Sequence, residues 1–124
     1  MASLFDMDVL IDYLRGLPDA VTAVESRIVG VCLSAMTVAE IYQSVREAEQ
    51  AKVARTSSSF TVLPITGEIP EMGGLLRRDH KSQGAGLADC LIAATALIHG
   101  LKWQTLSVKH FPMLNSLEPT YRKT

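Results

Sequence analysis

Apolar and polar positions along the chain form blocks that predict short strands separated by helices. Apolar runs with the length of buried strands occupy residues 3–5, 28–35, 59–65 and 102–108. Between them, apolar residues recur at helical spacing in segments 8–16, 18–26, 37–55, 68–82 and 88–100. The chain therefore predicts elements that alternate between strand and helix almost from end to end.

Two of the predicted helices differ from the rest. Segment 37–55 is expected to be one long amphipathic helix, because Val38, Ile41 and Val45 fall on a single face. Segment 68–82 is expected to be a weaker helix, because Gly73 and Gly74 lie in its interior.

Strands that alternate with helices imply a parallel sheet covered on both faces. We expect an α/β fold, a three-layer α/β/α sandwich with a mainly parallel sheet of four or five strands. The 124 residues suit a single domain over 1–124, and 48% hydrophobic with 20% charged residues is typical of globular proteins. No apolar run reaches the roughly 18 residues of a membrane span. The N-terminus lacks signal-peptide features, so we expect a cytoplasmic protein without a membrane partner.

Charge and cysteine content narrow the classes of function. Cys32 and Cys90 are too few and too far apart for a disulfide framework or a thiolate metal site. The net charge of −1 argues against holding nucleic acid by bulk charge alone. The net charge still allows a local basic patch. The basic residues that could steer a phosphate backbone, or could simply face solvent, are Arg77, Arg78, Lys81, Lys102 and Lys109.

Three acids fall at or just beyond the predicted carboxyl ends of strands, where open parallel sheets bind their ligands. Asp6 ends the first strand, Glu40 follows the second, and Asp89 opens the helix of segment 88–100. Carboxylates gathered in one place repel each other unless a cation compensates. Mg²⁺ or Mn²⁺ suits such oxygen ligands, and an ion held there can activate water for attack on a phosphodiester.

Each acid also has a purely structural interpretation. Glu40 can complete a helix-capping box with Thr37, and Asp89 can interact with the helix dipole. Asp8 is most simply a helix N-cap and Asp12 a solvent-facing helix residue. Asp6 is hardest to explain this way, because a strand-end acid among apolar neighbours is poorly solvated without a partner.

Three ordered blocks of sequence resemble the PIN-domain ribonucleases, specifically the VapC-like toxins of toxin–antitoxin pairs. They are LFDMDVLIDYLRG at residues 4–16, LSAMTVAEIY at 33–42, and GLADCLIAATALIHGLKWQTLSVKHFPML at 86–114. The resemblance covers roughly residues 3–118. By position, Asp6, Glu40 and Asp89 match the acidic metal-site residues of that family.

The resemblance implies a Mg²⁺-dependent endoribonuclease, with Mn²⁺ as a possible substitute, that acts as the toxin of such a pair. It also implies a homodimer and a cognate antitoxin, whose peptide lies along the acidic groove and places an Arg or Lys on the carboxylates. The substrate would be RNA, cleaved by a metal-activated water.

Two positions depart from the family pattern. Met7 stands where a Thr is usual, and Ser107 where a fourth acid or an Asn is frequent. The Ser107 hydroxyl could orient the attacking water, which would make it a fourth catalytic residue, or could merely bond its own backbone at a strand end. These departures leave open an alternative, a catalytically impaired PIN-fold module that binds a partner or RNA. A receiver domain is disfavoured, because segment 59–65 has no acid at its end.

Overall fold

Four short strands form one parallel sheet at the centre of the computed structural model, which describes residues 2–27, 30–114 and 117–123. Each neighbouring pair is parallel, and the order is β3-β2-β1-β4. The strands are β1 (Ser3–Phe5), β2 (Val31–Ser34), β3 (Thr61–Leu63) and β4 (Lys102–Gln104). The predicted mainly parallel sheet is confirmed.

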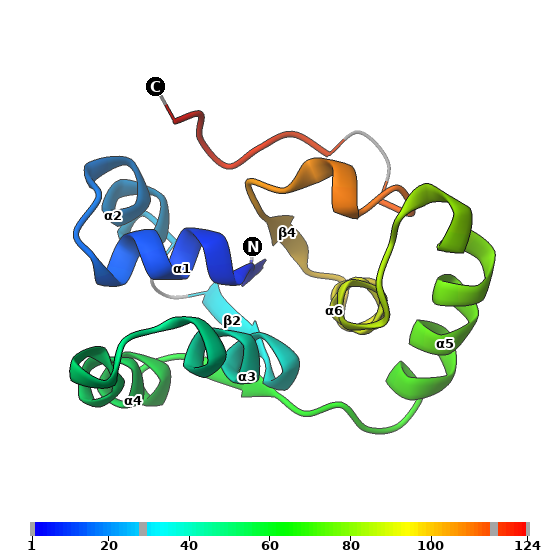
Figure 1. The fold of residues 1–124 in the computed structure, drawn as a ribbon, viewed down its shortest axis with the longest axis horizontal. Helices are drawn as coiled ribbons and strands as arrows, with labels where there is room; N and C mark the ends of the chain where they lie inside the picture. The colour runs from blue at the N-terminus through cyan, green and yellow to red at the C-terminus, as the bar shows by residue number, and fades with distance from the viewer. Residues whose placement is uncertain (1, 28–29, 115–116, 124) are drawn as a thin grey trace.

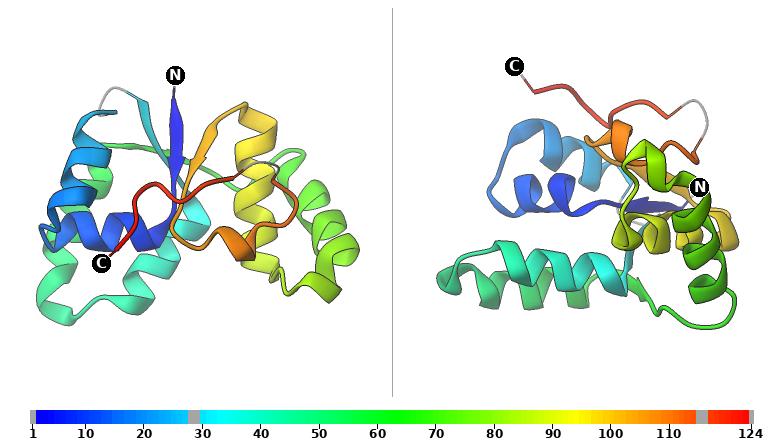
Figure 2. Two further views of the ribbon diagram at one scale, coloured as in Figure 1. Left: turned by 90° about the horizontal axis from the view of Figure 1, so that it is seen from above. Right: turned by 45° about the vertical axis from the view of Figure 1, so that its right-hand side comes forward.

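Helices cover both faces of this sheet, as Figures 1 and 2 show. Those on one side are α1 (Met7–Leu14), α2 (Pro18–Glu25), α3 (Ala35–Ser44) and α4 (Gln50–Ser58). The other side carries α5 (Ile69–His80) and α6 (Leu87–His99). Short 3-10 turns complete the connections: η2 (Glu47–Glu49), η3 (Lys81–Gln83) and η4 (Val108–His110). No helix in the described part of the chain is long and apolar enough to cross a membrane.

Two hydrophobic clusters lie on the two faces of the sheet. Adjacent residues of a strand point to opposite faces, so Phe5 joins the cluster beneath α1 to α4 while Leu4 joins the one beneath α6. In the second cluster Trp103 meets Phe111 edge to face, with ring centroids 5.0 Å apart. The predicted three-layer α/β/α sandwich is therefore confirmed.

The single helix predicted over 37–55 is wrong. Helix α3 ends at Ser44, and Val45 is extended (φ −86°, ψ 158°) before η2 and α4 follow. Glu49 explains why a new helical segment begins after Arg46, because one of its oxygens accepts from the Arg46 backbone N–H at 2.9 Å. The same carboxylate takes two hydrogen bonds from the Arg15 guanidinium, at 3.0 and 3.1 Å, which ties the break to α1.

Strand β1 has its predicted bounds, whereas β3 and β4 are shorter than predicted and β2 ends one residue earlier. Ala35 already belongs to α3, whereas Ile28 and Val29 lie outside the described residues. Strand β4 ends at Gln104, because the next three residues turn toward the acids of α1. The turn brings polar groups of segment 105–107 to the carboxyl edge of the sheet.

Helix α5 is a full twelve-residue helix despite its two glycines. Gly73 faces α6 so closely that a Cβ there would lie 2.6 Å from Leu91 Cδ2 and 3.2 Å from Leu91 Cα. Gly74, its neighbour, has nothing within 4 Å of the same position. The first glycine is thus required by helix packing, and the second is not.

Replacing Gly73 or Gly74 by alanine is expected to change the stability of the protein in opposite directions. Gly73→Ala is expected to lower the free energy of unfolding by about 1–3 kcal/mol, because the α6 backbone must move to accept the methyl group. Gly74→Ala is expected to raise it by about 0.5–1 kcal/mol through the better helix propensity of alanine. Urea unfolding of the two variants beside wild type measures both. A Gly73→Ala protein at least as stable as wild type would contradict the packing argument.

Candidate active site

Asp6 lies directly after β1 and caps the N-terminus of α1. One of its oxygens accepts from the Met7 backbone N–H at 2.8 Å, and the other accepts from the Thr105 hydroxyl at 2.6 Å. The Asp6 backbone N–H donates to the Gln104 carbonyl at 2.8 Å. The prediction that Asp8 is the N-cap is therefore wrong, because Asp6, still extended after the strand, is the residue placed to accept the first helical N–H.

Asp8 joins α1 to the turn after β4. Its Oδ2 accepts from the Leu106 backbone N–H at 3.1 Å and from the Ser107 hydroxyl at 3.0 Å. The Ser107 backbone N–H in turn donates to the Thr105 hydroxyl oxygen at 3.0 Å. The hydroxyl of Ser107 thus bonds an acid rather than its own backbone. Asp8 belongs to the same network as Asp6.

Glu40 and Asp89 reach the site from two different helices. Ser34, at the end of β2, caps α3 by accepting from the Met36 backbone N–H at 3.1 Å, so a capping box between Thr37 and Glu40 is not formed. The Oε1 atom of Glu40 is buried and has no hydrogen-bond partner among the described residues. Asp89 lies in the first turn of α6.

Burial and mutual repulsion raise the pKa values of these acids. The pKa of Asp6 rises to about 7, first because its carboxylate is desolvated and then because Asp8 and Glu40 repel its charge. The hydrogen bonds from Thr105 and Met7 oppose this rise. A carboxyl of this kind is half protonated near neutral pH unless a cation arrives.

The other acids follow the same trend. Burial is the largest cause of the raised pKa of Glu40, and repulsion by Asp89 and Asp8 adds to it. Burial likewise raises the pKa of Asp8 and of Asp89, and the nearby His110 partly opposes the rise at Asp89. Repulsion therefore links Asp6 to Glu40 and Glu40 to Asp89. Within residues 2–27, 30–114 and 117–123, no three His, Cys, Asp or Glu side chains are arranged to hold a metal ion directly.

The sequence pattern includes Thr105 in the block of residues 86–114 but gives it no role, whereas in the structure it is fully buried and its hydroxyl holds Asp6. One feature of the sequence could have indicated this role. Thr105 is a polar residue directly after the last strand, β4, just as Asp6 comes directly after the first, β1, and these two strands are neighbours in the sheet. Met7, by contrast, packs its side chain against the cluster beneath α1 to α4 and offers the site only its backbone N–H.

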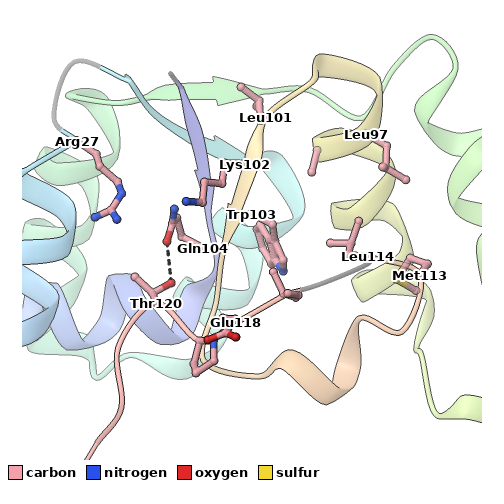
Figure 3. Close-up of a pocket in the computed structure, with 13 residues that line it drawn as sticks. Arg27, Leu97, Leu101, Lys102, Trp103, Gln104, Met113, Leu114, Glu118 and Thr120 are labelled. Atoms are coloured by element: carbon pink, nitrogen blue, oxygen red, sulfur yellow. Dashed lines mark hydrogen bonds between the residues drawn. The ribbon is translucent and has the colours of Figure 1, made fainter.

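A cavity of about 590 Å³ lies along the outer side of β4, away from these acids (Figure 3). Lys102, Trp103 and Gln104 contribute to its wall, and the Thr120 hydroxyl donates to the Gln104 side chain at 3.0 Å. None of Asp6, Glu40, Asp89 and Ser107 lines this cavity. The acids instead share the carboxyl edge of the sheet.

Comparison with known proteins assigns the family. The PIN domain family matches residues 4–106, most of the chain, including the strand-end acids and Thr105. The chain belongs to the PIN-domain family. The resemblance noted in the sequence is confirmed.

Relatives of this PIN domain are similar over nearly their whole length. The ribonuclease VapC10 of Mycobacterium tuberculosis is 41% identical over 122 residues, which are 95% of this chain and 92% of that protein. The ribonuclease VapC19 of the same organism is 33% identical over 123 residues, 95% of this chain and 98% of its own. A toxin–antitoxin complex from Klebsiella pneumoniae contains a chain with a TM-score of 0.84 and 28% identity, covering 98% of this chain and all of that one.

Proposed function

We propose that this PIN domain is an endoribonuclease that uses Mg²⁺ or Mn²⁺ and acts as the toxin of a toxin–antitoxin pair. The observation that carries the proposal is the set of mutually repelling acids at the carboxyl edge of the sheet, where Asp6 is buried and Glu40 and Asp89 are half-buried. The similarity to VapC10 over 95% of the chain supports the same activity.

The residues present fit a divalent cation. Glu40 keeps a buried oxygen without a partner among the described residues, and the pKa of Asp6 is raised by burial and by neighbouring negative charge. Both features cost free energy that a hard cation would recover. Asp6, Glu40 and Asp89 are the residues that would hold it. Since no three such side chains of the described residues already converge on one point, bound waters would complete its coordination. When bound, such an ion supplies a water activated for attack on the phosphodiester and charge to balance the phosphate.

The protein's own groups position these acids. Thr105 and the Met7 backbone N–H fix the two oxygens of Asp6, so the carboxylate cannot rotate away from the site. The Ser107 hydroxyl donates a hydrogen bond to Asp8, which leaves its oxygen able to accept a hydrogen bond from water. This is the role we propose for Ser107.

The same proposal includes two protein partners. The Klebsiella pneumoniae structure is a toxin–antitoxin complex, and we extend an antitoxin partner to this chain. We also propose a homodimer, for which the half-exposed Tyr42 on α3 offers apolar surface. Light scattering on the purified protein at micromolar concentration measures its mass, and a monomer would contradict the dimer.

The activity is tested by incubating the purified protein with total RNA and Mg²⁺ and sequencing the new RNA ends. We expect cleavage at defined sites, its loss in chelator, and its return with added Mg²⁺ or Mn²⁺. Co-purified antitoxin is expected to suppress it. A folded protein that cleaves no RNA with either ion would contradict the proposal and favour the impaired binding module.

A further inference from the structure

The C-terminal segment 117–123 is bound to the edge of the active site. The Thr120 backbone N–H donates at 3.0 Å to the carbonyl of Thr105, the residue whose hydroxyl holds Asp6. The Tyr121 hydroxyl donates to Asp12 on α1 at 2.7 Å, and the Lys123 ammonium pairs with the same carboxylate at 2.8 Å. Figure 2 shows this segment crossing from the end of β4 toward α1.

A cavity of about 390 Å³ lies between this segment and the turn after β4. Its volume is within the roughly 300–1,000 Å³ of small-ligand sites. Leu106, which lines it, also donates its backbone N–H to Asp8, so the cavity adjoins the acids. Leu106, Pro119 and Tyr121 give it apolar walls.

The same cavity has a basic side formed by Arg122 and Lys123. Lys123 is already paired with Asp12, whereas Arg122 is exposed and takes part in no ion pair of the described residues. An exposed guanidinium beside apolar walls is a combination typical of sites for single-stranded nucleic acid, which offer a cation to the backbone and an apolar face to the base.

We propose that this cavity is a subsite for the nucleotide of single-stranded RNA next to the bond that is cut. Its phosphate contacts Arg122, and its base or ribose packs on Leu106, Pro119 and Tyr121. This inference rests on the proposed ribonuclease function. It also supplies positive charge beside the clustered acids, whose own charge repels the RNA backbone at the point of cleavage.

Binding of a fluorescent single-stranded RNA, followed by anisotropy in chelator over a series of salt concentrations, tests the subsite. Arg122→Gln is expected to weaken binding by about tenfold to a hundredfold, as for the loss of a hydrogen bond to a charged group. The negative slope of log K against log salt concentration should become shallower by about 0.7, the value for one phosphate contact on a single strand. Arg122→Lys should recover the slope but only part of the affinity.

Arg55→Gln is the matched control, because Arg55 is an exposed arginine in the last turn of α4 that lines no part of this cavity. It should leave both affinity and slope unchanged. In cleavage assays Arg122→Gln should raise KM with little change in kcat, because the lost contact stabilises the bound substrate and the transition state equally. Thermal unfolding should be unaltered.

The outcomes separate the subsite from the activity. If wild type binds and cleaves RNA but Arg122→Gln behaves like wild type or like Arg55→Gln, the subsite is wrong and the ribonuclease proposal stands. That result would also follow if Arg122 served an acidic partner protein. If wild type neither binds nor cleaves RNA, both proposals fail.

Discussion

Asp6→Asn is expected to reduce RNA cleavage by about a hundredfold to a thousandfold, the range seen when one group that acts on developing charge is removed. The amide keeps the shape of the side chain, its oxygen can still accept from the Met7 backbone N–H, and its NH2 can donate to the Thr105 hydroxyl oxygen in place of the bond that Asp6 accepts. Asparagine also caps helices about as well as aspartate. The loss would therefore come from the missing negative charge, which a divalent cation requires. Initial cleavage rates at saturating Mg²⁺ measure it.

Asp19→Asn is the control for this variant. Asp19 is an exposed acid in the first turn of α2, so it changes the net charge equally without touching the site. It should cleave RNA at the wild-type rate. An Asp6→Asn protein with undiminished activity would exclude Asp6 from the metal site.

Metal-free protein is expected to lose stability as the pH rises from about 4 to about 7. The folded-state pKa of Asp6 is about 7, against 3.8 for an unperturbed carboxyl. Between these values the folded state binds more protons than the unfolded state, so the free energy of unfolding falls as pH increases. The full difference corresponds to roughly 4 kcal/mol at most. The raised pKa values of Asp8, Glu40 and Asp89 act in the same direction.

Urea unfolding in chelator at several pH values measures this loss. The hydrogen bond from Arg15 lowers the pKa of Glu49 to about 2, so Glu49 titrates below the range of interest. Asp6→Asn should flatten the dependence and make the protein more stable than wild type at pH of about 8, while Asp19→Asn should leave the curve unchanged. Added Mg²⁺ should restore wild-type stability at high pH. Equal stability of chelated wild type across this range would contradict the raised pKa.

These two results place activity and stability in opposition at one residue. The charge of Asp6 is costly to the empty fold and is needed for the chemistry. A substitution that removes the charge is expected to stabilise the protein and inactivate it, the usual relation between a functional site and its scaffold.

The sequence was sufficient to predict the sheet and the acids at its edge. The carboxyl ends of parallel strands meet at one edge, so an acid after each of two strands already indicates a shared site. Periodicity also placed α1, α2, α5 and α6 within a few residues. These features depend on local patterns and on a general rule of topology.

Features that depend on tertiary contacts were not predictable. The break after Ser44 relies on Glu49 meeting Arg15, 34 residues earlier in the chain. The role of Thr105 relies on a bond to Asp6 across 99 residues. The position of Arg122 depends on Tyr121 and Lys123 both reaching Asp12. No periodicity within a single segment carries this information.

The packing of Trp103 on Phe111 gives the protein an internal optical probe. Trp103 is its only tryptophan and lies in the cluster beneath α6, whereas Tyr13 and Tyr121 pack against the cluster on the opposite face. Tryptophan emission therefore follows one layer of the sandwich, and tyrosine absorbance follows chiefly the other. Coincident transitions of the two signals would show that both layers melt as one cooperative unit.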